Sequence, residues 1–167
     1  MIKKEVAGQI KMSFGMIFSI ILIIVFLVFA FYAIKIFLGI GDEAKTQKFI
    51  SDFQSDINRI WISDGESSEE KEYSLPSKIS YVCFVDFDMS ATGNNAGFYK
   101  ELKRAYYGSE NMIFYPIGSS EVESAELKNI NLDSIISYEN PYCIDNDGKI
   151  KLTLSKNYGK DLVTITR

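Results

Sequence analysis

The chain divides into one unbroken apolar stretch and a longer part in which apolar and polar residues alternate. Residues 12–34 contain no charged side chain, and 15 of these 23 residues are Leu, Ile, Val or Phe. A helix rises about 1.5 Å per residue, so the stretch is roughly 35 Å long and can cross a hydrocarbon core of about 30 Å. The pattern predicts a transmembrane helix over residues 12–38 that follows a basic tail at residues 1–11. The lipid bilayer is therefore the first partner that we expect.

Two other structures can contain a long apolar stretch. A core helix that is apolar on all sides must be surrounded by protein, and the domain formed by residues 42–167 is too small to surround it. A secretory signal has an apolar region of only about 7 to 15 residues. Gly39-Ile-Gly41 is a weak site for conventional signal cleavage, so the membrane-spanning interpretation is favoured.

The next segment has the spacing of an amphipathic helix. Its apolar residues recur every three or four positions, at Phe49, Ile50, Phe53, Ile57, Ile60 and Trp61. This period places them on one face, so we expect a stem helix over residues 39–62. Gly39 and Gly41 each cost about 1 kcal/mol relative to Ala in a helix. They permit a bend or a break without requiring one, and the span and the stem can form a single helix.

Residues 63–167 predict a small head that mixes strands and short helices. The expected elements are an exposed loop at 63–71, strands at 81–89 and 111–117, a short helix at 96–107, a hairpin at Asn146-Asp147-Gly148 and a last strand at 161–166. The predicted fold is therefore α+β, with a long N-terminal transmembrane and stem helix followed by a head that contains an antiparallel β-sheet and one or two short helices.

Charge is distributed unequally between the two parts of the chain. Residues 1–41 carry four Lys and one Glu, a net charge of +3, whereas residues 42–167 carry 14 Lys or Arg and 21 Asp or Glu, a net charge of −7. A domain at −7 repels nucleic-acid phosphate, so nucleic acid is excluded as a partner. The nearest approach to a basic cluster is Lys100, Lys103 and Arg104 with Glu101 among them, which we interpret as a solvated helix face.

The lysines that flank the span do not decide its orientation by number. Three lie before it (Lys3, Lys4 and Lys11) and three after it (Lys35, Lys45 and Lys48). Lys35 can reach either headgroup layer, a short basic tail is easily retained inside the cell, and two distal cysteines suit an oxidising exterior. We therefore expect a single-pass protein of the cell membrane, with a cytoplasmic N-terminus and an extracytoplasmic C-terminal domain.

The side chains present argue against catalysis and against a bound metal or cofactor. The chain has no His, so it contains no Ser-His-Asp triad, and no glycine-rich phosphate loop is present. Asp86/Asp88 and Asp145/Asp147 are the candidate calcium pairs. In a calcium loop that begins at Asp145, the fifth and twelfth positions would be Lys149 and Lys156. A hairpin turn explains Asp145 and Asp147 better, and a solvated strand end explains Asp86 and Asp88 better. We therefore expect neither an enzyme nor a metal site.

Cys83 and Cys143 both lie in segments with strand-like patterns. A disulfide between adjacent strands would close a loop of about 60 residues and stabilise the fold by roughly 4 kcal/mol in the loop-entropy model. The alternative is two buried free thiols that act as small apolar side chains.

The N-terminal sequence Lys3-Lys4-Glu5-Val6-Ala7-Gly8-Gln9, followed by the apolar helix, resembles the class III signal peptide of archaeal type IV pilin-like proteins. In that family a prepilin peptidase cuts after Gly and leaves Gln as the first mature residue. The resemblance implies processing between Gly8 and Gln9. It also implies a prepilin peptidase and copies of the chain itself in a filament as partners, and a structural or adhesive role.

The long helix with an amphipathic outer half and a small β-rich head also looks like a pilin. The chain departs from the family at Ser13, the fifth mature position, where such proteins often carry a Glu that pairs with a neighbour's amino terminus. The alternative function is an uncleaved signal-anchored extracytoplasmic domain that binds a partner or a ligand.

Overall fold

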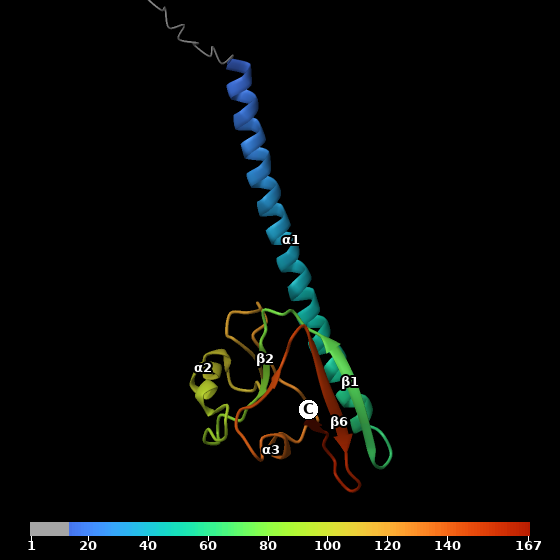
Figure 1. The fold of residues 1–167 in the computed structure, drawn as a ribbon. Coiled ribbons are helices and arrows are strands. Elements are labelled where there is room, and N and C mark those ends of the chain that lie inside the picture. Colours follow the sequence, from blue (N-terminus) through green and yellow to red (C-terminus); the bar gives the residue numbers. More distant parts are fainter. Residues whose placement is uncertain (1–13) are drawn as a thin grey trace, which may run out of the picture. The chain divides into compact units, whose positions relative to one another are not determined.

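The computed structural model describes residues 14–167 and has the predicted α+β architecture (Figure 1). A long helix precedes a head that contains two antiparallel sheets and several short helices. The chain forms two compact units, of which the first ends at Gly39 and the second comprises Ile40–Arg167. The second unit therefore contains the outer part of the long helix as well as the head.

Helix α1, Phe14–Trp61, is one continuous element of 48 residues. Gly39 and Gly41 lie inside it, and a Cβ atom at either position would meet nothing within 4 Å. Neither glycine is therefore needed for close packing. The span and the stem that the sequence predicts are parts of the same helix.

The apolar face of the outer part of α1 lies at the centre of the head core. Its side chains that are at most 2% exposed are Phe49, Phe53, Ile57 and Ile60. Phe49 and Phe53 stack with their ring centroids 5.3 Å apart, and Tyr73 meets both rings edge-on. At about 1.5 to 3 kcal/mol for each fully buried side chain, this face is a main contributor to the stability of the head. Trp61 was expected on the same face but is 40% exposed, because it is the last residue of the helix.

The head contains two sheets in which every strand pair is antiparallel. The first has the order β1-β6-β7, formed by Ser67–Ser74, Lys149–Lys156 and Thr164–Thr166. The second has the order β4-β3-β2-β5, formed by Ser124–Ala125, Met112–Tyr115, Tyr81–Phe84 and Tyr142–Asp145. The short helices are η1 (Ala96–Phe98), α2 (Tyr99–Leu102), η2 (Lys103–Ala105) and α3 (Leu132–Ile135).

The second sheet separates two apolar clusters, because successive side chains of a strand point to opposite faces. Val82 and Phe84 of β2 belong to the main core, together with the buried face of α1. Cys83 lies on the other face of β2, in a smaller cluster with Leu102 and Ala105 of the α2–η2 segment. The sheet is therefore covered by protein on both sides.

The loop predicted over residues 63–71 is in part a strand, because β1 begins at Ser67. Along β1 the exposed and less exposed side chains alternate, and its apolar residue Tyr73 is buried. The whole strand pairs with β6, and Lys149 of β6 forms an ion pair with Glu72 at 2.6 Å. A charged edge strand resists pairing with other chains. The loop prediction is wrong from Ser67 onwards because the polar composition conceals a strand whose partner lies far along the chain.

The hairpin predicted at Asn146-Asp147-Gly148 is also wrong, because the strands on either side belong to different sheets. Strand β5 pairs with β2, whereas β6 pairs with β1. Asn146 fixes this connection: its buried Nδ2 donates to the carbonyls of Pro76 (3.0 Å) and Ile79 (2.7 Å), and its Oδ1 accepts from the Gly148 amide (3.1 Å). The chain does turn at these residues, but the turn connects strands of two different sheets, and the hydrogen bonds of Asn146 hold it in that position.

Four predicted elements are shorter in the structure. The strand expected at 81–89 ends at Phe84, because the side chain of Asn140 binds the backbone amide and carbonyl of Asp86, at 3.1 and 2.8 Å. The helix expected at 96–107 consists of the three short pieces η1, α2 and η2, and the last strand is limited to β7. Strand β3 ends just before Pro116, in agreement with the expected effect of that residue.

The hydrogen bonds of the Asn146 side chain predict that Asp is no better tolerated than Ala at this position. Asn146→Ala leaves buried backbone groups unpaired and should lower the free energy of unfolding of the head by about 2 to 3 kcal/mol. Asn146→Asp should be at least as damaging, because a carboxylate would face the carbonyls of Pro76 and Ile79. The measurement is urea unfolding of the full chain followed by near-UV circular dichroism. Asp147→Asn, at the exposed neighbour, is the control and should change stability little; a milder effect of Asp than of Ala at position 146 would contradict the assignment.

Candidate membrane anchor and head sites

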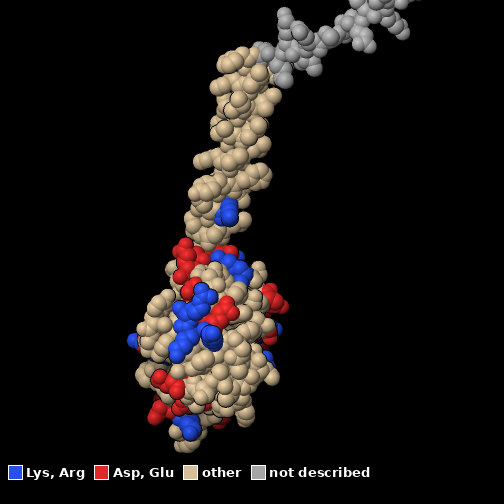
Figure 2. Space-filling model, turned by 90° about the vertical axis from the view of Figure 1, so that its left-hand side faces the viewer, with Lys and Arg blue, Asp and Glu red and all other residues tan. Residues whose placement is uncertain are grey.

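The first part of α1 presents apolar side chains on all sides. Every large apolar side chain in residues 14–40 is exposed, by between 37% and 84%. Lys35 is the only charged residue in this segment, and Figure 2 shows a helix surface that is almost entirely uncharged there. Within residues 14–167, α1 is the helix that is long and apolar enough to cross a bilayer. A long apolar N-terminal helix of this kind is compatible with a membrane anchor.

Glu43 holds the outer part of α1 to the head directly after the apolar segment. Its Oε2 accepts from the Ser120 hydroxyl (2.8 Å) and the Glu121 amide (3.0 Å), and its Oε1 accepts from Lys78 Nζ (3.2 Å). Burial by itself raises the pKa of Glu43, but these hydrogen bonds outweigh it and lower the pKa below its ordinary value. The carboxylate therefore stays ionised and joins the helix to two loops of the head. The sequence analysis missed Glu43, whose available signal is its position among the first acidic residues after the apolar stretch.

A second polar network lies near the end of α1. Arg59 donates to both carboxylate oxygens of Glu69 in β1. It also donates to Oδ1 of Asp56, at 2.7 Å. The Tyr73 hydroxyl donates to Oδ2 of Asp56 at 2.8 Å, and Lys71 approaches Glu69 at 3.3 Å. Arg59 first, and then Lys71, lower the pKa of Glu69 to about 2. The network fastens the edge strand β1 to the helix.

The structure joins Cys83 and Cys143 in a disulfide between the neighbouring strands β2 and β5. The two residues are direct partners in the strand register, with their Cα atoms 4.0 Å apart, and both are almost fully buried. The bond cross-links residues 60 positions apart. This arrangement matches the cross-strand bond that the sequence favours over two free thiols, and it makes the cysteines structural.

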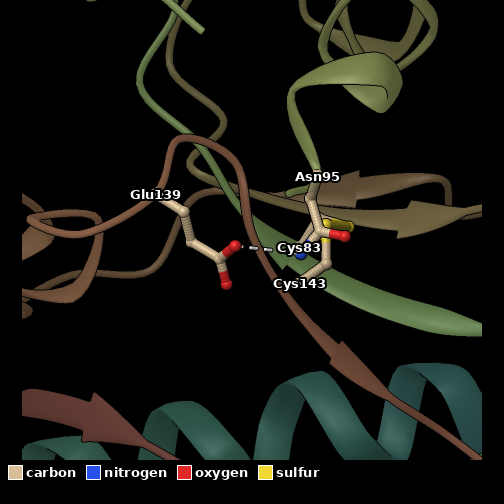
Figure 3. Close-up of a disulfide and its surroundings, with 4 residues drawn as sticks. All are labelled: Cys83, Asn95, Glu139 and Cys143. Atoms are coloured by element: carbon tan, nitrogen blue, oxygen red, sulfur yellow. Dashed lines mark hydrogen bonds between the residues drawn. A yellow bond between two sulfur atoms is a disulfide. The ribbon is translucent and has the colours of Figure 1, made fainter. Parts of the chain in front are cut away.

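Asn95, in the loop before α2, and Glu139 lie in the surroundings of this disulfide (Figure 3). Asn95 Nδ2 donates to Glu139 Oε2 at 3.4 Å. Gly93 has a φ of +78°, and a Cβ atom there would lie 2.3 Å from the Cβ of Glu139. Only glycine fits that position, because both its backbone conformation and its contact exclude a side chain.

The two candidate calcium pairs have structural roles or remain exposed. Asp86 Oδ1 accepts from the Asp88 amide at 2.8 Å, and Asn140 holds the Asp86 backbone. Asp145 and Asp147 are exposed on either side of the buried Asn146. Across residues 14–167, no three His, Cys, Asp or Glu side chains gather as a metal site would require. The proposed processing residues Gly8 and Gln9, and Ser13, lie outside the described residues.

The contacts of Glu69 predict that the attachment of β1 to α1 becomes weaker at low pH. A lowered pKa in the folded state means that the stabilisation is complete above the usual value of 4.5 and is lost as the pH falls towards about 2. Glu69→Gln should therefore be less stable than the wild type at about pH 6 and lose less stability between about pH 6 and pH 3. Urea unfolding at a series of pH values measures both effects.

Glu70→Gln is the matched control, because Glu70 lies in the same strand and its exposed side chain forms no hydrogen bond or ion pair within residues 14–167. It should follow the wild-type pH profile. Equal pH dependence in Glu69→Gln and the wild type would show that Glu69 does not stabilise the fold.

Comparison of the chain with protein-family models, with curated proteins and with solved structures finds no match. The apolar helix, the contacts that join its outer part to the head, and the buried disulfide are thus the observations that bear on function.

Proposed function

We propose that this chain is a single-pass, membrane-anchored surface protein with a structural or adhesive role and no enzymatic activity. The observation that carries the proposal is the composition of helix α1. Its first part exposes apolar side chains on every side, and its outer part contributes one buried face to the head core. The first part suits a bilayer, and the second holds the head to the anchor without a separate linker.

The proposed orientation places the N-terminus in the cytoplasm and the head outside the cell. The disulfide between Cys83 and Cys143 supports it, because such bonds persist in oxidising compartments. The short basic tail supports it as well, since such tails are retained on the cytoplasmic side.

The non-enzymatic part of the proposal rests on how the polar side chains are used. The chain lacks His, the most frequent catalytic acid and base. The carboxylates of Glu43 and Glu69 are engaged by neighbouring groups that hold α1 in place. Their lowered pKa values reflect attachment, and neither is poised near neutral pH for proton transfer.

The finer proposal is that the protein is a type IV pilin-like subunit. It is supported by the resemblance of residues 3–9 to a class III signal and by a long N-terminal helix with a buried outer face. The alternative, an uncleaved signal-anchored domain that binds a partner or ligand, is favoured by Ser13, since this position carries no carboxylate to pair with a neighbour's amino terminus.

Membrane integration and orientation can be tested together in cells. The protein should remain in the pellet after alkaline carbonate extraction, because its apolar helix is inserted in lipid. Protease added to intact cells should remove the head. Release by carbonate would refute the anchor, whereas full protection in intact cells, lost on lysis, would show the opposite orientation.

Processing tests the pilin resemblance. With an active prepilin peptidase present, mass spectrometry should find a protein that begins at Gln9. Gly8→Val should leave the uncut precursor, because a side chain before the scissile bond obstructs the approach of the backbone to the catalytic carboxylates. Ser13→Ala is the matched control and should be cut normally. Wild-type protein that retains residues 1–8 would favour the signal-anchored domain over the pilin-like subunit.

A further inference from the structure

Gly39 and Gly41 lie inside helix α1 at positions where the packing does not require glycine. A Cβ atom at either residue would meet nothing within 4 Å, and neither residue has a positive φ. In a helix interior, glycine favours local opening more than any residue except proline, because its backbone gains the most freedom. The pair is therefore a weak point in a regular helix, and the surrounding packing does not account for it.

The head begins to hold α1 directly after these glycines. Among the residues described, the first hydrogen bonds and ion pairs that join the helix to the head belong to Asp42 and Glu43. About one turn later, Thr46 is the first buried side chain of the helix. The first compact unit of the chain ends at Gly39, and the second begins at Ile40. The glycines thus lie at the start of the part of α1 that the head holds.

Lys35 places the glycines at the outer limit of the lipid, given the membrane anchor proposed above. A charged side chain avoids hydrocarbon, so Lys35 lies among the headgroups and residues 14–34 fill the core of about 30 Å. Gly39 and Gly41 follow Lys35 by four and six residues, a rise of about 6 and 9 Å. The headgroup layer is about 5 to 7 Å thick on each side of the core. Water therefore reaches the backbone at the glycines and competes for its hydrogen bonds, which it cannot do in hydrocarbon.

We propose that Gly39–Gly41 is a hinge of α1, at which the helix opens locally and the head changes its direction relative to the anchored part. The hinge rests on the proposed membrane anchor, because lipid holds the helix before the glycines and the head holds it after them. Glu43 confines the opening, since its bonds to the head keep the following turns of α1 in place. The head therefore stays folded while the surfaces that it exposes change direction.

Hydrogen exchange of the full chain in phosphatidylcholine nanodiscs, resolved to single residues by mass spectrometry, tests the hinge. In the wild type, the amides of residues 39–45 should exchange faster than those of residues 20–30, in lipid, and of residues 49–57, in the head core. The double variant Gly39→Ala, Gly41→Ala should slow exchange at residues 39–45 by about thirtyfold, the combined helix preference of two alanines over two glycines. Both added methyl groups enter open space, so the variant leaves the packing of α1 unchanged.

Ala30→Gly is the matched control, because it places a glycine in the apolar part of the same helix. Without water to replace the helical hydrogen bonds, exchange at residues 30–34 should rise by less than about threefold. Ser51→Ala, at an exposed position in the part of α1 that the head holds, should leave exchange at residues 39–45 unchanged. An opening at Ala30→Gly as large as that at the native glycines would contradict the role given to water at the hinge.

The change of direction is measured by electron-spin distances between labels attached at Val28→Cys and Tyr158→Cys, which are both exposed positions. Cys83 and Cys143 take no label, because they are buried and joined to each other. The distribution of distances should be broad in the wild type and narrower in the double alanine variant.

Two results would overturn the hinge and leave the anchor intact. They are exchange at residues 39–45 as slow as at residues 20–30 in the wild type, and equal exchange and equal distance distributions in the wild type and the double alanine variant. Fast exchange at residues 20–30 would instead refute the membrane anchor, and the hinge with it. Near-UV circular dichroism of each variant verifies that its head is folded.

Discussion

Helix α1 is one continuous helix whose two parts need different surroundings. In residues 14–40 its apolar side chains are exposed on every side, a composition compatible with a membrane anchor. From Phe49 onwards only one face is apolar, and the head buries Phe49, Phe53, Ile57 and Ile60 on that face. Both sheets of the head contribute side chains to this buried face, so the arrangement of the head depends on the helix that it surrounds.

Polar contacts hold this helix to the head at both ends of the buried face. Glu43 binds the loops that contain Lys78 and Ser120, and Arg59 binds Glu69 of β1. The apolar core supplies most of the favourable free energy, since exposed ion pairs contribute little individually. The polar contacts instead specify how the head is oriented on the outer part of α1, because each requires a particular side chain at a particular position on the helix.

The opposite face of the second sheet is organised differently. There the disulfide of Cys83 and Cys143 joins β2 to β5, and the α2–η2 segment covers the bond. This covering segment packs Leu102 and Ala105 against the bond and exposes Lys100, Lys103 and Arg104. One face of the second sheet therefore packs on α1, whereas the short helices cover the other face.

The elements that follow from local patterns could be predicted before the fold was known. The charge-free residues 12–34 predict a helix that can span a membrane, and the spacing of Phe49, Phe53 and Ile57 predicts a helix with one buried face. These periodic signals depend only on neighbouring residues, and the structure agrees with them. The strand-like patterns around both cysteines favoured a bond between adjacent strands, but their direct pairing in β2 and β5 is a tertiary contact.

The pairing of the strands and the course of the connections between them depend on contacts between distant segments. The polar segment at Ser67–Ser74 is a strand because β6 supplies its partner, and Asn146 starts a connection between sheets because its amide reaches Pro76 and Ile79. The Glu43 and Asn140 contacts likewise join residues more than 30 positions apart. A local pattern reports propensity and period, whereas strand partners and buried hydrogen bonds depend on segments that meet only after the chain has folded.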